Sequence, residues 1–382
     1  MKLLIDARSL GSHPSGVGIY LYDFLKEMIK QDSFEITLLS DVALSNEMQW
    51  LAQQNIPIIT YGKHIAQSAG VFQYFKFIQD SLDYYQPDLF WEPNNLIPVP
   101  LRRFTGKIMV TIHDIFPISQ PEHHGFLYPK YFRYGMKQTL KQADLITYNS
   151  VETKCETENR FPQAKNISHM VSYIIVNKPD LSDAPVTPDV LFPNVKVDGE
   201  DFFLYIGNLE KRKGTDLLLK AYEKYRALGG EKKLYLGGRI RESEIQQLFD
   251  RIQEEVPGIA SLGYVGNEEK NALFRYCSGF LFPSRAEGFG IPVVEAMHFN
   301  KPILASNLSI FHEIVGDAIT YFDCSGTEEE QIQNLAEAML QLKSADFEAY
   351  STVTRRYLPF QLGEDFCDYI KKESVRRRNE GV

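Results

Sequence analysis

The stretch FPSRAEGFGIPVVEAM, from Phe282 to Met297, decides how the rest of the chain is interpreted. An apolar run ends at Phe282, a turn with Gly288 and Gly290 follows, and Pro292 marks the first turn of a helix. The free backbone N–H groups of such a turn and the positive end of the helix attract an anion, and glycines let it approach closely. The stretch therefore predicts a strand-turn-helix unit that holds a diphosphate or the leaving oxygen of a sugar.

Two glutamates in this stretch have two interpretations that remain equally open on physical grounds. Glu287 falls in the turn and Glu295 falls about one turn into the helix, so the two carboxylates would reach different parts of one elongated ligand. A sugar hydroxyl and a ribose diol suit them, because carboxylates accept paired hydrogen bonds. Alternatively, Glu287 caps the turn and Glu295 stabilises the helix N-terminus by its charge, worth about 0.3 to 1 kcal/mol.

Apolar, β-branched runs alternate with helix-period segments along the chain, which predicts α/β architecture with parallel sheets. The expected strands are Leu3 to Asp6, Glu35 to Leu39, Ile58 to Thr60, Leu89 to Trp91, Ile108 to His113, Leu145 to Asn149, Phe202 to Ile206, Leu234 to Leu236, Leu262 to Tyr264, Gly279 to Phe282, Pro302 to Ala305 and Ile319 to Phe322. A proline-rich lapse between Asn177 and Glu200 predicts a connector. We expect two doubly wound, Rossmann-like domains facing across a cleft, at 1–190 and 200–360, with a last helix in 361–382 packing back toward the N-terminal domain.

The composition is that of a globular protein without affinity for nucleic acid. The 382 residues are 44% hydrophobic and 24% charged, with a formal net charge of −9, whereas phosphate binding on nucleic acid needs excess Lys and Arg. No apolar run approaches the roughly 20 residues of a membrane span, and the first residues lack a secretory signal pattern. The four cysteines are scattered and no Asp-x-Asp pair occurs. We expect reduced thiols, no metal, no cofactor and a cytoplasmic location.

EGFGIPVVEAM, residues 287–297, resembles the two-glutamate signature of glycosyltransferase family four, the "glycosyl transferases group 1" type of retaining enzyme with the GT-B fold. Five further segments resemble that family and follow its order. They are Ser15 to Gly18 (SGVG), Val110 to Asp114 (VTIHD), Ala143 to Ser150 (ADLITYNS), Tyr205 to Gly214 (YIGNLEKRKG) and Gly263 to Gly266 (GYVG). The resemblance covers nearly the whole chain and implies an N-terminal acceptor-binding domain and a C-terminal nucleotide-sugar-binding domain.

The resemblance also implies roles for particular residues. Glu287 would lie beside the transferred sugar, Glu295 would bind the ribose, and Lys213, placed between them, would neutralise the diphosphate and strengthen the leaving group without a metal. His113, at an expected strand end, would aim its ring or its carbonyl at the sugar. The expected catalytic residues are Glu287, His113 and Lys213, and the expected donor-binding residues are Gly16, Gly18, Asn208, Arg212, Lys213, Gly288, Phe289, Gly290, Ile291 and Glu295.

One position departs from the family pattern. Asn208 stands where the family usually has an arginine after the strand glycine, and Arg212 or Arg239 would compensate. Gly16 and Gly18 would let the first turn of the N-terminal domain approach the phosphates or the acceptor, although they lack the third glycine of a dinucleotide-binding turn.

A basic and aromatic stretch from Pro129 to Lys141, with the aromatic run from Phe72 to Phe77, has two interpretations. Both stretches have a helical period. They would either meet a membrane surface or pack their aromatic rings inward while lysines face water, and the second interpretation is favoured.

The sequence thus predicts a retaining transferase that moves a hexosyl unit from a nucleoside diphosphate sugar to a saccharide or lipid-linked saccharide acceptor. Cell-surface polysaccharide or glycoconjugate assembly is the expected setting, at the inner face of the membrane if there is peripheral contact. An inactive nucleotide-sugar-binding partner of another transferase is the alternative, prompted by Asn208. An NAD-type oxidoreductase is disfavoured because no G-x-G-x-x-G turn with a following ribose-binding acid occurs.

Overall fold

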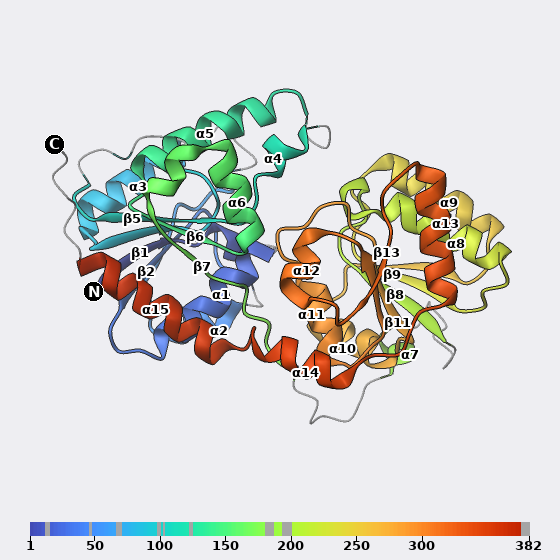
Figure 1. Cartoon of the computed structure of the whole chain (residues 1–382). Helices are drawn as coiled ribbons and strands as arrows, with labels where there is room; N and C mark the ends of the chain where they lie inside the picture. The colour runs from blue at the N-terminus through green and yellow to red at the C-terminus, as the bar shows by residue number, and fades with distance from the viewer. Residues whose placement is uncertain are drawn as a thin grey trace. The chain divides into compact units, whose positions relative to one another are not determined.

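A computed structural model describes residues 1–11, 16–45, 48–65, 71–97, 101, 104–121, 125–179, 187–192 and 201–375. The chain divides into two compact units, one formed by Met1–Ile175 with Leu358–Val382 and the other by Val176–Tyr357. Figure 1 shows both units, and each is described by itself. Three expected features lie outside the described residues, namely Ser15, most of the connector (180–186 and 193–200) and the end of the chain from 376.

The first unit is built on a parallel sheet with the strand order β3-β2-β1-β4-β5-β6-β7. Its strands are β1 (Lys2–Asp6), β2 (Glu35–Ser40), β3 (Ile58–Thr60), β4 (Leu89–Glu92), β5 (Lys107–Ile112), β6 (Leu145–Tyr148) and β7 (Ser168–Val171). Its helices are α1 (Gly16–Ile29), α2 (Gln49–Ala52), α3 (Val71–Tyr85), α4 (Phe116–Ser119), α5 (Tyr128–Gln142), α6 (Val151–Arg160) and α15 (Pro359–Val375). Figure 1 shows α3, α5 and α6 over one face of the sheet and α1 over the other.

The second unit repeats this plan with the strand order β10-β9-β8-β11-β12-β13, again parallel. Its strands are β8 (Phe202–Ile206), β9 (Lys233–Gly237), β10 (Ile259–Gly263), β11 (Gly279–Phe282), β12 (Ile303–Ser306) and β13 (Thr320–Phe322). Its helices are α7 (Pro188–Leu191), α8 (Thr215–Ala227), α9 (Ser243–Glu255), α10 (Asn267–Tyr276), α11 (Ile291–His298), α12 (Ser309–Val315), α13 (Glu328–Leu340) and α14 (Phe347–Arg355).

The central strands are buried along their whole length. All residues of β4 and of β8, including Phe202, Phe203 and Tyr205, are buried. Helices on both faces of a parallel sheet leave neither face in water, so such strands are runs of apolar residues rather than alternating ones, and Glu92 at the end of β4 is the one charged residue of these two strands. These runs confirm the predicted fold class, two Rossmann-like units with parallel sheets.

Three details differ from the sequence prediction. β7 was not predicted, because its residues are only half-buried at the sheet edge and give no apolar run. β10 begins at Ile259 rather than Leu262, for the same reason: beyond Ile259 its residues are only half-buried. Gly16 and Gly18, expected in a turn, lie in the first turn of α1.

The chain crosses between the units at different residues from those expected. The division falls between Ile175 and Val176, whereas the sequence analysis placed the connector after Asn177. Val176 belongs to the second unit because its N–H donates to the carbonyl of Tyr357 at 2.9 Å. The chain returns to the first unit at Leu358, three residues before the expected 361.

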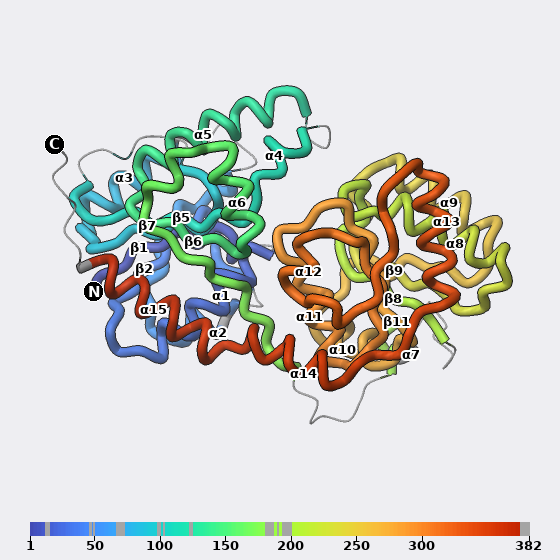
Figure 2. Tube along the Cα trace, viewed as in Figure 1, coloured from blue at the N-terminus to red at the C-terminus, as the bar shows by residue number. Residues whose placement is uncertain are grey.

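Helix α15 packs against α1 in the first unit, as Figure 2 shows. Phe366 is fully buried, with its ring 4.3 Å from that of Phe24 and 5.1 Å from that of Trp91. The two helices approach so closely at Gly363 that an added Cβ would lie 2.6 Å from Cβ of Glu27. A side chain there would push the helices apart, so glycine is required. Among the helices in the described ranges, none is long and apolar enough to cross a membrane.

We expect Phe366→Ala to lower the free energy of unfolding of the first unit by about 3 to 5 kcal/mol, because it leaves a cavity beneath α15. Urea unfolding followed by tryptophan fluorescence, which reports on Trp91, measures this change. Phe360→Ala is the matched control on the same helix, because Phe360 is 70% exposed, and it should change stability little. Equal effects of the two variants would contradict the packing of α15.

Candidate functional site

In the second sheet the order in which strands are added reverses between β8 and β11. The loops after these two strands carry most of the expected site residues. Strand order runs outward from β8 through β9 on one side and from β11 through β12 on the other. Ligands of doubly wound sheets bind outside the carboxyl ends of the strands at such a switch point. The loop after β8 leads to Lys213, and the loop after β11 leads to Glu287.

The two loops are in direct contact at Gly214. This residue has φ of 66°, and an added Cβ would lie 1.9 Å from the carbonyl oxygen of Pro283. The Arg285 N–H also donates to the Arg212 carbonyl at 2.9 Å. Only glycine allows both this backbone conformation and this approach. The neighbouring Lys213 is thereby held beside the loop after β11.

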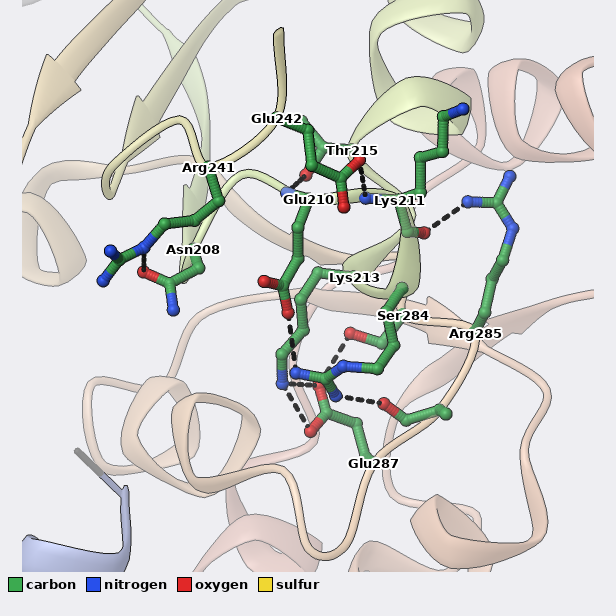
Figure 3. A network of polar contacts seen from close by, with 12 residues as sticks. Asn208, Glu210, Lys211, Lys213, Thr215, Arg241, Glu242, Ser284, Arg285 and Glu287 are labelled. Carbon is green, nitrogen blue, oxygen red and sulfur yellow. Dashed lines mark hydrogen bonds and ion pairs between the residues drawn. The ribbon is translucent and has the colours of Figure 1, made fainter. Parts of the chain in front are cut away.

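Lys213 and Glu287 form an ion pair at this contact, as Figure 3 shows. The Lys213 Nζ lies 2.6 Å and 2.7 Å from the two carboxylate oxygens of Glu287. The Ser284 hydroxyl donates to Oε1 of the same carboxylate at 2.7 Å. The side chain of Glu287 is 7% exposed and that of Lys213 is 18% exposed, so the pair is shielded yet not sealed. A charged pair in this environment can exchange one partner for a ligand group of the same sign.

Two arginines brace the turn that carries Lys213. Arg285 binds both oxygens of Asp216, at 2.5 Å and 3.0 Å, and donates to the Lys211 carbonyl. Arg212 pairs with Glu210 at 2.7 Å and donates to the Ala286 carbonyl at 3.2 Å. Arg212 thus ties the loop after β8 to the residue just before Glu287.

Asn208 has a cationic neighbour that the sequence analysis did not identify. Nε of Arg241 donates to the side-chain oxygen of Asn208 at 3.4 Å. The Tyr205 hydroxyl donates to the backbone carbonyl of Asn208 at 2.9 Å. Arg239, one of the two residues expected to compensate, instead stacks on the ring of Tyr264 at 5.2 Å. Spacing along the sequence could not separate Arg239 from Arg241, because only the folded chain shows that Arg241 contacts Asn208 and Arg239 contacts Tyr264.

The N-terminus of α11 follows the Glu287 turn. Gly290 is the N-cap with φ of 94°, and an added Cβ would lie 2.7 Å from the Phe311 ring. No side chain caps this end, Pro292 has no N–H, and the Val293 N–H donates to the Gly290 carbonyl at 3.0 Å, so an anion here would bind the N–H groups that precede Pro292. Phe289 is buried against Tyr357, with ring centroids 5.2 Å apart, and fixes the turn. Gly288 and Ile291, on either side, are half-buried.

Glu295 lies further along α11 and has its own partner. Nζ of Lys270, on α10, is 2.5 Å from its carboxylate, and the two side chains are 16% and 19% exposed. The structure therefore pairs each signature glutamate with a different lysine, Lys213 for Glu287 and Lys270 for Glu295. Lys270 was missed in the sequence because it lies 25 residues before Glu295 in a helix rich in charged residues.

His113, Gly16 and Gly18 lie in the first unit. Nε2 of His113 is 2.9 Å from the Pro93 carbonyl, and because a carbonyl only accepts, this nitrogen carries the proton. The backbone N–H of His113 donates to the side-chain oxygen of Asn95 at 2.7 Å, and the backbone carbonyl of His113 accepts from the Thr153 hydroxyl at 3.2 Å. Burial lowers the pKa of His113 to about 4, so the imidazole is neutral at pH 7.

The first unit also has an ionic cluster at its own switch point, between β1 and β4. Arg8 Nε lies 2.7 Å from Asp6, and Arg8 Nη2 donates to Glu92 at 3.0 Å. The Tyr74 hydroxyl donates to Asp6 at 3.0 Å, and its ring lies under the guanidinium. Burial and the adjacent Asp6 raise the pKa of Glu92. This cluster was not predicted from the sequence, although acidic residues at the ends of apolar strands were the available signal.

Comparisons with known proteins agree with this architecture. Residues 187–353 match the model of the family described as glycosyl transferases group 1. The chain is 31% identical over 245 residues to O-antigen chain mannosyltransferase B of Escherichia coli, covering 61% of each chain. It is 26% identical over 219 residues to O-antigen chain mannosyltransferase RfbU of Salmonella typhimurium, covering 56% of this chain and 55% of that one. The matches thus span a little over half the length of these relatives.

Among solved structures, the chain resembles HepE of Anabaena in complex with UDP-glucose, with a TM-score of 0.76 at 17% identity. The match covers 97% of this chain and 100% of that one. The apo lipopolysaccharide outer core galactosyltransferase WaaB gives a TM-score of 0.66 at 14% identity, over 98% of this chain and all of that one. These likenesses confirm the GT-B fold class.

Because the folded-state pKa of His113 is lowered, we expect it to make the first unit less stable as the pH falls. The unfolded side chain takes up a proton near pH 6.5 and the buried one only near pH 4, so stability is lost across that interval. Between pH 7 and about pH 4.5 the loss should be roughly 2 to 3 kcal/mol. His113→Gln should remove this part of the slope in urea unfolding.

The exposed His312 supplies the matched control for that experiment. His312→Gln should keep the wild-type pH dependence. A wild-type slope in His113→Gln would show that His113 is not held neutral.

Proposed function

We propose that this chain, whose residues 187–353 match the model of glycosyl transferases group 1, transfers a hexosyl unit from a nucleoside diphosphate sugar to a saccharide or lipid-linked saccharide. The pair between Lys213 and Glu287 carries the proposal, because it puts a cation and a hydrogen-bond acceptor side by side at the switch point of the second sheet. The expected setting is cell-surface polysaccharide synthesis, supported by the O-antigen mannosyltransferase relatives. Since several relatives are mannosyltransferases, GDP-mannose is the first donor to test.

The donor would exchange the ion-pair partners found in the structure. Its diphosphate would draw Lys213 from Glu287 and bind backbone N–H groups near Phe289 and Gly290 at the start of α11. Glu287 would then accept hydrogen bonds from the sugar hydroxyls, and Glu295 would accept those of the ribose in place of Lys270. Lys213 and Lys270 therefore contact the carboxylates that the sugar hydroxyls and the ribose would contact in the donor complex.

We further propose that the transfer retains the anomeric configuration by front-face substitution. The bond between the anomeric carbon and the phosphate oxygen breaks, and the acceptor oxygen bonds to that carbon from the same face. The acceptor hydroxyl proton passes to the departing phosphate oxygen. Lys213 and the α11 N-terminus stabilise the charge on that oxygen, so the step uses neither a metal ion nor a cofactor.

The neutral His113 would act by position rather than by proton transfer. Its single ring proton is held by the Pro93 carbonyl, so it fixes the loop after β5 at the carboxyl edge of the first sheet. Gly16 and Gly18, in the first turn of α1, lie after β1 on the same sheet. This edge is the proposed acceptor side of the enzyme.

We expect Glu287→Gln to lower turnover by about a hundredfold or more, because the amide cannot replace the charge that positions Lys213 and the sugar. Release of the nucleoside diphosphate from GDP-mannose, UDP-glucose and dTDP-rhamnose in the presence of acceptor measures this. Glu254→Gln on the exposed side of α9 is the matched control and should keep wild-type turnover.

Two outcomes would count against this assignment. Wild-type turnover in Glu287→Gln would remove Glu287 from the site. Donor binding by the wild type, seen as a thermal shift with every donor tested but never followed by turnover, would point to a binding partner without activity.

We expect Arg241, rather than Arg239, to take the phosphate-binding role of the arginine that is missing at position 208. Arg241→Ala should weaken donor binding by about tenfold, because a hydrogen bond to a charged group is lost. Arg239→Ala, which loses only the contact with Tyr264, should bind the donor like the wild type. Calorimetric titration with the donor found above measures both, and the reverse order of effects would reject Arg241.

A further inference from the structure

The segment 125–142, which contains α5, carries a row of large apolar side chains on its outer surface. Phe126 is 79% exposed and Leu127 is 73% exposed. Tyr128, Tyr131 and Tyr134 are also exposed. Isolated exposed apolar residues are ordinary, but a contiguous group on one segment marks a contact surface. The favoured sequence interpretation, with the aromatic rings packed inward, therefore holds for Phe132 but not for Tyr131 and Tyr134.

Cations share this surface with the aromatic rings. The exposed basic residues of the segment are Lys130, Arg133, Lys137 and Lys141, and the segment contains no Asp or Glu. The whole chain has a net charge of −9, whereas the charged residues of this segment are all basic. The ammonium of Lys130 lies 3.9 Å from the centre of the Phe126 ring, which keeps cation and ring together. We call the exposed aromatic and basic residues of 125–142 the aromatic-basic face.

The opposite side of α5 is firmly packed, so the aromatic-basic face is not a loose core. Phe132, Met136 and Leu140 are buried, and at Gly135 an added Cβ would meet the Leu96 side chain at 3.1 Å. The helix therefore holds the face in a fixed arrangement. By contrast, on α3 Tyr74 and Phe75 are buried and Phe77 packs against the core, whereas Tyr84 is exposed near the end of that helix.

The aromatic-basic face begins beside the carboxyl edge of the first sheet. Burial and the nearby Asp114, which follows β5, raise the pKa of Tyr128. Burial also raises the pKa of Tyr131, and the Arg8 guanidinium opposes that rise. Asp114 and Arg8 both leave strands at the carboxyl edge, which is the proposed acceptor side.

We propose that the aromatic-basic face docks on an anionic phospholipid bilayer. Aromatic and aliphatic side chains enter the boundary between headgroups and acyl chains, and lysines and arginines attract the phosphates, as on interfacial helices. The absence of carboxylates on the segment removes the repulsion that such a surface would otherwise meet. Docking in this way would bring the carboxyl edge of the first unit close to a lipid-linked acceptor. Only this last consequence rests on the proposed function.

Vesicle co-sedimentation of the full chain tests the proposal. Wild-type protein should bind vesicles of phosphatidylcholine with phosphatidylglycerol, and should bind pure phosphatidylcholine weakly. The double variant Lys130→Glu with Lys137→Glu should reduce binding to the anionic vesicles by about tenfold or more, since each cation near the surface contributes about fivefold. Phe126→Ser with Leu127→Ser should also reduce binding, and moderate salt should weaken the wild type.

Matched controls come from exposed residues in the second unit. Lys343→Glu and Phe347→Ser change the same residue types and should leave binding unchanged. No wild-type binding, equal binding to neutral vesicles, or equal loss in the controls would overturn the proposal. Self-association that the Phe126 and Leu127 variant abolishes, without vesicle binding, would assign the face to a second copy of this chain.

Turnover on a soluble acceptor separates this proposal from the proposed function. The variants of the aromatic-basic face should keep wild-type turnover on such an acceptor, because the face is not part of the donor site. An inactive protein that still binds anionic vesicles would contradict the proposed function and would support the proposed docking face.

Discussion

The ion pair between Lys213 and Glu287 is the interaction on which the candidate site depends. It requires two loops that are more than 70 residues apart in the chain to meet after β8 and β11, and Gly214 is what lets the backbones come close enough. Burying two charges is costly unless each stays paired, so a donor can enter only by replacing one partner with another of like charge. In the proposed donor complex, a diphosphate takes the place of Glu287 beside Lys213 as an anion of like charge, and the neutral sugar hydroxyls donate hydrogen bonds to Glu287, so the pair suits a nucleotide sugar better than an uncharged ligand.

The same constraint operates in both units. Strands buried on two faces place their charged groups at the strand ends, and the carboxyl ends at a switch point are where such groups gather. In the first unit this position holds Arg8 between Asp6 and Glu92, whose carboxylates are buried, so the cluster mainly fixes the ends of β1 and β4. In the second unit the Lys213 side chain is as exposed as that of Arg8, at 18%, but Glu287 keeps 7% exposure against 0% for Asp6 and 1% for Glu92.

The first unit also differs from the rest of the chain in the charge of part of its surface. The first unit carries the aromatic-basic face, where cations and exposed rings lie together, whereas the chain as a whole is acidic. Phe132, Met136 and Leu140 hold α5 on the sheet, whereas Phe126, Leu127 and Tyr134 are more than half exposed. The helix period of the sequence is the same whether rings point inward or outward, and only the packed structure shows that Phe132 is inside while Tyr131 and Tyr134 are outside.

The sequence by itself determined the fold class, because long apolar strand runs such as β8 require helices on both faces. It pointed to Glu287 and Glu295 through a local turn-helix pattern, and to Lys213 only through the resemblance to glycosyltransferase family four. It did not locate β7 or the start of β10, whose residues at the sheet edge are only half-buried. Tertiary structure alone decided that Lys213 pairs with Glu287 and Lys270 with Glu295, and that Arg241 lies beside Asn208. The reason is physical: residue types and spacing set local conformation, whereas charge pairing depends on which loops the sheet order brings together.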